Sequence, residues 1–279
     1  MLQLYNDVSF RISRIVTRSY STSFSIAVSF LNSEERNAIY SIYGFVRFAD
    51  EIVDTFHDFD KTGLLTGFED NYYKAFQNGM SLNPVLHSFQ ATVKKYSIPD
   101  ELIQAFLKSM KADLVKNGSY SKPEIDEYIY GSAEAVGLMC LCVFVKGNRN
   151  LYDELQYPAM KLGSAFQKVN FLRDLKNDIY DLNRIYFPEL DINTFNQENK
   201  NRIIEDIEAD FTASLSGIKK LPKNAKLPVL IAYYYYLHLL NKIRDTKPEK
   251  LISTRISVPG FSKFLLFKKA YLAVKLGLI

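Results

Sequence analysis

Apolar residues recur at intervals of three and four along most of this chain, the spacing that buries one face of a helix. The pattern predicts long helices over residues 32–56, 123–145, 151–182, 198–216, 225–244 and 261–279. Asn32-Ser33-Glu34-Glu35 has the order of a capping box at the start of the first of them. Pro84 and Pro99 each fit the first turn of a further helix, where a missing amide costs no hydrogen bond.

Turn-forming residues separate these predicted helices. Asn117-Gly118 and Gly147 each follow an apolar-periodic segment and are expected to end a helix. Pro158 lies early in one of the long helices and is expected to kink it or delay its start. Polar, turn-prone residues over 189–197 and the segment 245–259 are predicted loops.

The composition fits one helical domain. The chain has 279 residues, of which 47% are hydrophobic and 24% charged, as in an ordinary globular protein. Only 12 residues are glycine and 9 are proline, which favours long helices over a turn-rich β fold. Because no repeat or linker divides the chain, we predict a single all-α domain over residues 1–279 with about nine or ten helices.

Charge and cysteine content narrow the location and the partners. A net charge of +4 and a pI of about 8.8 are too weakly basic to indicate nucleic-acid binding. The only two cysteines, Cys140 and Cys142, suit neither a disulfide nor a zinc site, so a reducing compartment is expected. The N-terminus does not read as a signal peptide, and the longest apolar run, 136–145, is shorter than the roughly 20 residues that span a bilayer. We therefore predict a cytoplasmic protein.

The first candidate for chemistry is the acidic stretch Arg-Phe-Ala-Asp-Glu-Ile-Val-Asp over 47–54. Asp50 and Asp54 are four residues apart, so both carboxylates lie on one helix face, which Tyr43 and Arg47 continue. Taken alone, such a face is equally typical of a solvated helix surface.

A second stretch, about 120 residues further on, has a more specific composition. A polar stripe with spacings of three and four residues consists of Gln167, Asn170, Asp174, Asp178 and Asp181. Solvated helix faces usually carry Lys and Glu, whereas this one carries short oxygen donors that suit Mg²⁺ and its waters. Arg173 and Arg184 lie nearby in the sequence, and guanidinium groups suit diphosphate oxygens. If the two acidic stretches face each other, their aspartates form a cage for hard divalent cations, Mg²⁺ or Mn²⁺, which in turn bind a diphosphate.

These motifs make the chain resemble the squalene and phytoene synthases, which join two prenyl chains head to head, and most of all the bacterial phytoene synthases. The resemblance covers nearly the whole chain and rests on residues 20–24, 40–54, 128–139 and 167–188. The two long signatures, 40–54 and 167–188, are the specific part, because they occur in order and at the family's spacing. The family implies an isoprenoid synthase fold, with helices around a central cavity.

The resemblance also implies roles for individual residues. The implied Mg²⁺ ligands are Asp50, Asp54, Asp174 and Asp178, with Asn170 and Gln167 completing the metal and phosphate shell. The implied diphosphate-binding residues are Arg47, Arg173 and Arg184. The residues implied to line the reacting end of the pocket are Ser21, Ser23, Tyr43, Tyr130 and Tyr186, with Tyr130 counted among the catalytic residues.

Four positions depart from the family pattern. Thr22 stands where many relatives have Lys, so one phosphate contact is missing or replaced. Glu51 replaces the second Asp of a common pair and keeps the carboxylate. Glu134 stands where Gly is usual, and either a helix-surface position or a pocket role would explain it. Asn177 replaces a common acid beside the second Asp pair and removes one negative charge.

The implied reaction condenses two prenyl diphosphates through a cyclopropane intermediate, presqualene or prephytoene diphosphate. We expect two geranylgeranyl diphosphates to give phytoene, as in carotenoid biosynthesis, without a reductant. The alternative on the same fold is a squalene, dehydrosqualene or hydroxysqualene synthase acting on farnesyl diphosphate, and NADPH is required only for squalene. No dinucleotide fingerprint is present, which weakly favours phytoene. An alternative of another class is a non-catalytic protein that binds prenyl lipids or acts in assembly. Chain length of the substrate and oligomeric state cannot be read from the sequence.

The predicted C-terminal helix indicates one further partner. Its apolar stripe consists of Phe264, Phe267, Tyr271, Val274 and Leu278, and Lys263, Lys268, Lys269 and Lys275 surround it. This pattern fits docking on an anionic membrane surface, which would place the protein peripherally on the inner face of the membrane. A last core helix with its lysines in water explains the same pattern.

Overall fold

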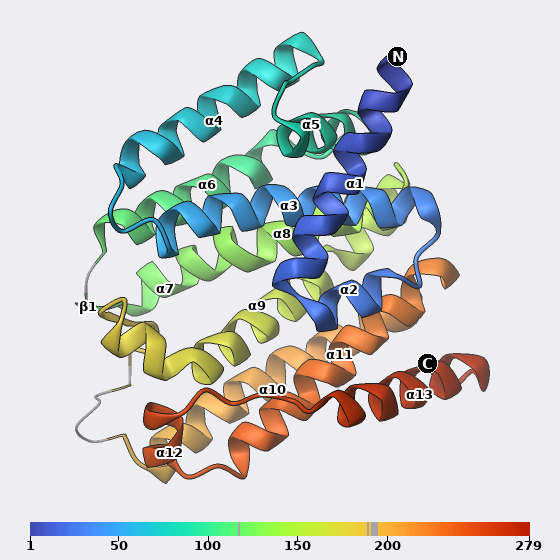
Figure 1. The fold of residues 1–279 in the computed structure, drawn as a ribbon. Coiled ribbons are helices and arrows are strands. Elements are labelled where there is room, and N and C mark those ends of the chain that lie inside the picture. The colour runs from blue at the N-terminus through green and yellow to red at the C-terminus, as the bar shows by residue number, and fades with distance from the viewer. Residues whose placement is uncertain (117, 189, 191–194) are drawn as a thin grey trace.

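The computed structural model describes residues 1–279 apart from 117, 189 and 191–194, and it is almost entirely helical (Figure 1). In chain order the elements are α1 (Leu2–Tyr20), α2 (Thr22–Val28), α3 (Ser33–Asp54), α4 (Lys61–Asn78), α5 (Pro84–Tyr96), α6 (Asp100–Val115), β1 (Gly118–Ser119), α7 (Lys122–Ile129), η1 (Tyr130–Glu134), α8 (Ala135–Val145), α9 (Arg149–Tyr180), β2 (Arg184–Ile185), α10 (Gln197–Lys220), α11 (Lys223–Arg244), α12 (Pro248–Ser253) and α13 (Gly260–Lys275). The all-α prediction is confirmed.

Local capping explains where the helices begin. Asn32 caps α3 by accepting a hydrogen bond from the amide of Glu35 at 3.0 Å, and Asn148 caps α9 in the same way. The second half of the expected capping box is not made, because the buried Glu35 carboxylate pairs with Lys146 at 2.8 Å instead. The helix therefore starts where predicted, and its third residue ties α3 to the end of α8.

The helix of residues 122–145 crosses the interior of the molecule. It is continuous through α7, the π-helical turn η1 and α8. By length and composition it could span a membrane, but 61% of its most apolar window is buried inside the protein, as in a core helix. Gly131 lets η1 approach α6 closely, since a Cβ there would lie 2.3 Å from the carbonyl oxygen of Ala105.

Three details differ from the sequence predictions. The helix α9 begins at Arg149 and continues through Pro158, so this proline does not delay its start. The predicted loop 245–259 contains the short helix α12. The helices outnumber the nine or ten expected because short ones such as α2 and α12 carry too little periodicity to predict. Residue 117 and most of the predicted loop 189–197 lie outside the described residues.

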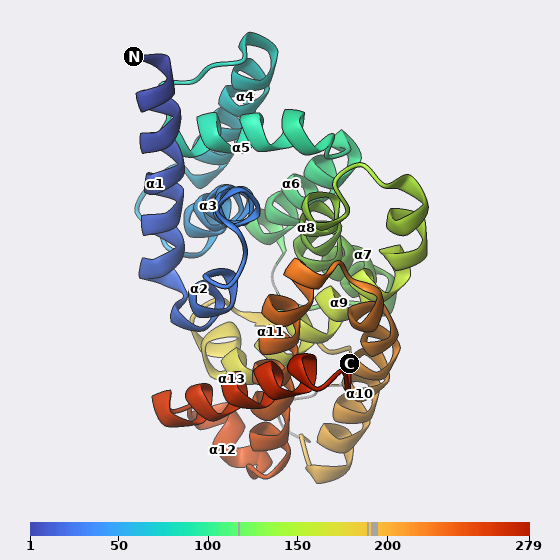
Figure 2. The same ribbon diagram turned by 90° about the vertical axis from the view of Figure 1, so that its right-hand side faces the viewer.

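Two hydrophobic clusters form the interior. The first is built from α3, α4, α5, α6 and α8 around Phe45 and Phe89, whose rings stack at 3.9 Å. The second is built from α7, the later part of α9, α10, α11 and α13. Figure 2 looks nearly along α3, with α1, α5 and α6 beside it, and shows α9 and α11 below. The acidic end of α3 and that of α9 therefore belong to different clusters.

A two-residue parallel ladder pins the chain next to the acidic stretches. In this ladder Gly118 pairs with Arg184 and Ser119 with Ile185. The ladder joins the end of α6 to the segment after α9. The ladder brings the side chain of Arg184 close to the C-terminal end of α3.

Candidate active site

The first acidic stretch ends α3 with its charged side chains on one face. Arg47 forms ion pairs with Asp50 and Glu51, one turn further along the helix. Its guanidinium also lies over the ring of Tyr20, 4.3 Å from the centroid. Arg47 thereby links the end of α1 to the acidic end of α3.

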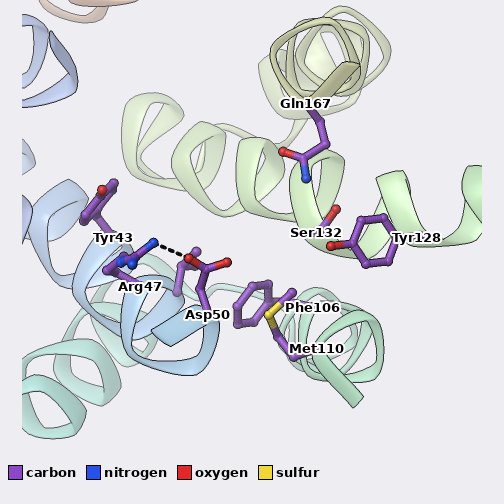
Figure 3. A pocket seen from close by; sticks show the side chains of 9 residues that line it. Tyr43, Arg47, Asp50, Phe106, Met110, Tyr128, Ser132 and Gln167 are labelled. Atoms are coloured by element: carbon purple, nitrogen blue, oxygen red, sulfur yellow. Dashed lines mark hydrogen bonds and ion pairs between the residues drawn. The ribbon is translucent and has the colours of Figure 1, made fainter. Parts of the chain in front are cut away.

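A cavity of about 160 Å³ opens beside this face. Its lining residues are Tyr43, Val46, Arg47 and Asp50 from α3, Phe106 and Met110 from α6, Tyr128 and Ser132 from α7 and η1, and Gln167 from α9. Figure 3 shows Arg47 and Asp50 on one side, with Phe106 and Met110 beneath and Gln167 on the opposite wall. The cavity is thus polar on the side of the acidic stretch and apolar below it.

The second acidic stretch lies on α9 and is held by arginines. Arg173 donates from Nε to Oδ1 of Asp174 at 3.0 Å. Arg255, which lies between α12 and α13, donates to the same oxygen at 2.6 Å. Asn170 and the half-buried Tyr236 of α11 interact through their side chains. Within the described part of the chain, Oδ1 of Asn170 is buried without a hydrogen-bond partner.

A buried network underlies both stretches. Arg184, only 5% exposed, donates to Asp54 at 3.1 Å and to the backbone carbonyl of Asp113 at 2.8 Å. The Asp113 carboxylate accepts hydrogen bonds from Tyr128 at 2.7 Å and from Tyr120 at 3.2 Å. Arg184 therefore connects Asp113 of α6 and Asp54 of α3 in one network.

The positively charged side chains of the site do not fully balance the negative charge of its carboxylates. Desolvation and the neighbouring Asp54 raise the pKa of Asp50 to about 7. Desolvation together with Asp174 and Asp54 raises the pKa of Asp178 to about 8. Burial raises the pKa of Asp174 as well, but hydrogen bonds from Arg173 and Arg255 outweigh it and the net direction is down. Since Asp54 acts on acids of both helices, the two acidic stretches do face each other.

The donor set fits a hard divalent cation, although the acids are now paired with arginines. Among the described residues, no three His, Cys, Asp or Glu side chains lie close enough to form a ready metal site. The available donors are nevertheless carboxylate and amide oxygens, with raised pKa values at Asp50 and Asp178 and an unpartnered oxygen at Asn170. Asp50, Asp54, Asp174, Asp178 and Asn170 are the residues that could hold such an ion.

Two tyrosines of the central helix differ in their position relative to the cavity. Tyr128, and not Tyr130, belongs to the described lining of the cavity. Residues two positions apart on a helix have side chains on nearly opposite faces. Tyr130 lies close enough to Tyr152 to influence the pKa of Tyr152. Tyr130 therefore lies outside this lining, whereas Tyr128 lines the cavity and its hydroxyl donates to Asp113.

The other residues expected at the pocket lie around its rim or below it. Ser21 caps α2 through the amide of Phe24 and hydrogen-bonds Tyr43. Ser23 is half-buried in α2 and is not part of the described lining. Tyr186 lies in the buried network, where its ring stacks on Phe171 at 4.0 Å.

Two residues of the site were missed from the sequence. Asp113 stands on an apolar helix without a motif around it, and only its burial next to Arg184 marks it. Arg255 lies in a predicted loop 81 residues from Asp174, and no local signal connects the two. Of the departures from the family pattern, Asn177 is exposed, whereas Glu134 is half-buried, and burial raises its pKa to about 7.

A helical protein whose two acidic helices face each other beside a cavity with an apolar wall has the architecture of an isoprenoid synthase. A model of the family described as squalene/phytoene synthase matches residues 17–262. The chain belongs to the squalene/phytoene synthase family, and it is therefore a prenyltransferase whose substrates are prenyl diphosphates.

Individual relatives agree with this assignment. The chain is 26% identical to a phytoene synthase of Arthrospira platensis, over 96% of this chain and 94% of that one. It is also 26% identical to a 15-cis-phytoene synthase of Synechocystis, over 95% of this chain and 85% of that one. Its fold matches a crystal structure of a dehydrosqualene synthase in complex with a ligand, with a TM-score of 0.83, 22% identity and 98% of each chain covered. A squalene synthase from Alicyclobacillus acidocaldarius matches with a TM-score of 0.75 and 21% identity, over 86% of this chain and 95% of that one. Together these comparisons support head-to-head condensation.

Proposed function

We propose that the protein condenses two geranylgeranyl diphosphates to phytoene through prephytoene diphosphate, with Mg²⁺ or Mn²⁺ as cofactor and without NADPH. The observation that carries the proposal is the pair of facing acidic helix ends beside a cavity that is polar on one side and apolar below. The curated relatives that align over nearly the whole chain are phytoene synthases, which favours the C20 substrate over farnesyl diphosphate.

The arginines of the site are suited to bind the diphosphates. Within the described residues, Nε of Arg47 is buried without a hydrogen-bond partner, so it can donate to an incoming phosphate oxygen. Arg173 and Arg184 each hold an aspartate through planar guanidinium groups that match phosphate geometry equally well. These arginines are now paired with carboxylates, and a bound diphosphate would compete with the carboxylates for them. A divalent cation would then be needed to balance the negative charge of the acids.

The aspartates and Asn170 would hold that cation. When bound, it would draw electron density from the diphosphate and so assist its departure. Desolvation and neighbouring acids raise the pKa values of Asp50 and Asp178. A bound cation would balance the negative charge of these two carboxylates.

The lower part of the cavity is suited to a carbocation. Val46, Phe106 and Met110 form an apolar wall that excludes water from the reacting carbons. The ring face of Phe106 can also stabilise positive charge. Burial raises the pKa of Tyr43 to about 12, so at neutral pH its hydroxyl is a hydrogen-bond donor and not a base.

Product analysis by mass spectrometry tests the proposal. Purified protein is incubated with Mg²⁺ and geranylgeranyl or farnesyl diphosphate, with and without NADPH. We expect a C40 hydrocarbon from geranylgeranyl diphosphate without NADPH. A C30 product from farnesyl diphosphate alone would replace this proposal by the squalene or dehydrosqualene branch, which NADPH dependence separates. No product from either substrate would favour the non-catalytic alternative.

Substitution of the acids tests the metal assignment. Asp50→Asn and Asp174→Asn each remove one negative charge and keep the side-chain volume, so we expect turnover to fall by roughly three orders of magnitude, since the cation depends on its carboxylate ligands. Far-UV circular dichroism should be unchanged. Full activity in either variant would contradict the metal cage.

We also propose that α13 docks peripherally on the inner face of an anionic membrane. Phe264, Leu265 and Leu272 project outward and are about half exposed. Lys268 and Lys275 lie on the same face, and no acidic residue occurs from 260 to 279. An outward face that is both apolar and positively charged is suited to the headgroup region, where a C40 hydrocarbon would be delivered.

A further inference from the structure

Lys263 in the first turn of α13 contacts α2 and α11 and does not lie on the outward face of its helix. Its Nζ lies 3.2 Å from the hydroxyl of Thr22 at the start of α2. It also lies 5.7 Å from the ring centroid of Tyr235 on α11. Lys263 thus joins three elements that are far apart in the sequence, and both α2 and α13 pack against α11.

These contacts place Lys263 at the rim of the diphosphate site. On one side, Thr22 is two residues from Tyr20, whose ring carries the guanidinium of Arg47. On the other side, Tyr235 is close enough to Arg173 to affect its pKa. Arg255, in the segment that precedes α13, donates to Asp174 at 2.6 Å. Through Thr22 and Tyr235, Lys263 is therefore linked to the surroundings of Arg47 and of Arg173.

Lys263 differs from the other three cations in what it contacts. Arg47, Arg173 and Arg255 each form an ion pair with a carboxylate of the site. Among the described residues no carboxylate pairs with Lys263, whose polar side-chain contact is the neutral hydroxyl of Thr22. An ammonium without a carboxylate partner can bind an anion without first breaking an ion pair.

We propose that Lys263 binds a diphosphate oxygen of a substrate and supplies the positive charge that many relatives carry as a lysine at position 22. The inference rests on the proposed function for the identity of the ligand as a prenyl diphosphate. In this chain the shorter Thr22 leaves room at that position, and its hydroxyl orients the ammonium that arrives from α13. The cation is thus relocated from α2 to α13.

Equilibrium binding of inorganic diphosphate in the presence of Mg²⁺, measured by isothermal titration calorimetry, tests the assignment. Loss of one charge-assisted hydrogen bond should weaken binding about tenfold in Lys263→Ala and Lys263→Gln. The double variant Thr22→Lys/Lys263→Ala carries the ammonium on α2 in place of α13. Its affinity for diphosphate should recover to within about threefold of wild type. Thermal unfolding of each variant verifies that α13 remains folded.

Lys94 provides the matched control. It too is a lysine over an aromatic ring, 5.1 Å from the centroid of Phe76, but it lies on α5 at the opposite end of the molecule (Figure 1). Lys94→Ala should bind diphosphate as wild type does. Wild-type affinity in Lys263→Ala would overturn the inference, and so would an equal loss in Lys94→Ala, which would indicate a general charge effect.

The outcome also separates this inference from the proposed function. If diphosphate binding depends on Lys263 but the wild-type protein forms neither a C40 nor a C30 product, the inference stands and the proposed function fails. If the wild-type protein forms phytoene and Lys263→Ala retains its diphosphate affinity, the function stands and the inference fails. If the wild-type protein binds no inorganic diphosphate, the inference is wrong, and the product analysis alone decides the proposed function.

Discussion

Asp113 is the residue on which the buried half of the site depends. It is 7% exposed, and it accepts hydrogen bonds from two tyrosines, one of which lines the cavity. Its carboxylate also faces Arg184, 3.6 Å away, which in turn holds Asp54. Burial raises the pKa of Asp113 to about 6 against the opposing effect of Arg184. A buried guanidinium needs such a partner, because an unpaired charge in the interior is strongly unfavourable.

We expect Asp113→Asn to lower kcat by roughly a hundredfold, since about 2–3 kcal/mol of charge-assisted interaction is lost around Arg184 and Asp54 is no longer held in place. Steady-state kinetics with the prenyl diphosphate substrate measures the effect. Asp126→Asn is the control, because Asp126 forms an exposed ion pair with Lys122 on α7. Unchanged kinetics in Asp113→Asn would show that Arg184 is positioned without this carboxylate.

At the scale of residues, the sequence predicts motifs better than it predicts buried partners. The acidic stretches could be found because both aspartates of each pair lie on one helix at a spacing that chemistry explains. Asp113 and Arg255 could not be found, because only tertiary packing brings them to Arg184 and Asp174. Which of Tyr128 and Tyr130 lines the cavity could not be predicted either, since both lie in the same motif and only the orientation of the helix distinguishes them.

The contact between α9 and α10 depends on a buried ion network. Asp210 of α10 is 5% exposed and accepts hydrogen bonds from Lys168 and Ser164 of α9, each at 2.7 Å. Lys161 lies 3.1 Å from its other oxygen. Burial raises the pKa of Asp210, but these hydrogen bonds outweigh it, so the folded-state pKa is below the ordinary value.

This depressed pKa predicts a dependence of stability on pH. The network stabilises the fold fully above the unfolded-state pKa of about 4, and its contribution is lost as the pH falls through the lower folded-state value. We expect Asp210→Asn to lower the free energy of unfolding by about 3 kcal/mol at pH 7, with a smaller difference below about pH 4. Urea unfolding over this pH range measures it. Asp206→Asn is the control, because Asp206 also contacts Lys168 but is 61% exposed. A constant difference at every pH would contradict the role of the Asp210 charge.

The helix α13 shows how packing changes the meaning of a sequence pattern. Phe267 and Val274 of the predicted stripe pack against the second hydrophobic cluster. Ala270 and Ala273 are also buried, so the helix buries two of its smallest residues while Phe264, Leu265 and Leu272 remain exposed. The pattern predicted an amphipathic helix correctly, but only the fold shows which apolar residues are covered. The outward face is therefore different from the predicted stripe.

Vesicle binding tests the outward face of α13. The paired substitution Phe264→Ser/Leu272→Ser removes two apolar side chains, each worth about 1.5–3 kcal/mol when fully buried, so binding to phosphatidylglycerol vesicles should weaken more than tenfold. Co-sedimentation measures the bound fraction. Phe59→Ser/Leu82→Ser is the control, since both residues are exposed and lie on either side of α4, which is far from α13 in Figure 1. Equal binding by all three proteins, or binding that is independent of anionic lipid, would argue against docking through α13.

At the scale of the whole molecule, the site lies at the junction of two hydrophobic clusters. The buried residues beside the first acidic stretch, such as Ile52 and Val53, belong to one cluster, and those beside the second, such as Leu172 and Leu175, belong to the other. The sequence predicts one domain over residues 1–279, and its periodicity does not indicate this internal division. Helical spacing reports which face of an element is buried, but not which other elements cover it.

This junction predicts that a ligand stabilises the fold as a whole. An Mg²⁺–diphosphate complex held by α3 and α9 would bind the folded state alone, and at a hundredfold excess over its Kd it would add about 2.7 kcal/mol to the free energy of unfolding. For a chain of 279 residues this corresponds to a rise in Tm of roughly 5 °C. Differential scanning calorimetry with Mg²⁺ and an unreactive prenyl thiodiphosphate measures the rise, and EDTA should abolish it. Asp174→Asn should lose most of the rise, whereas Asp126→Asn, with its exposed ion pair on α7, should keep it. A rise of the same size in EDTA would mean that the arginines alone hold the diphosphate, and the aspartates would then need another role.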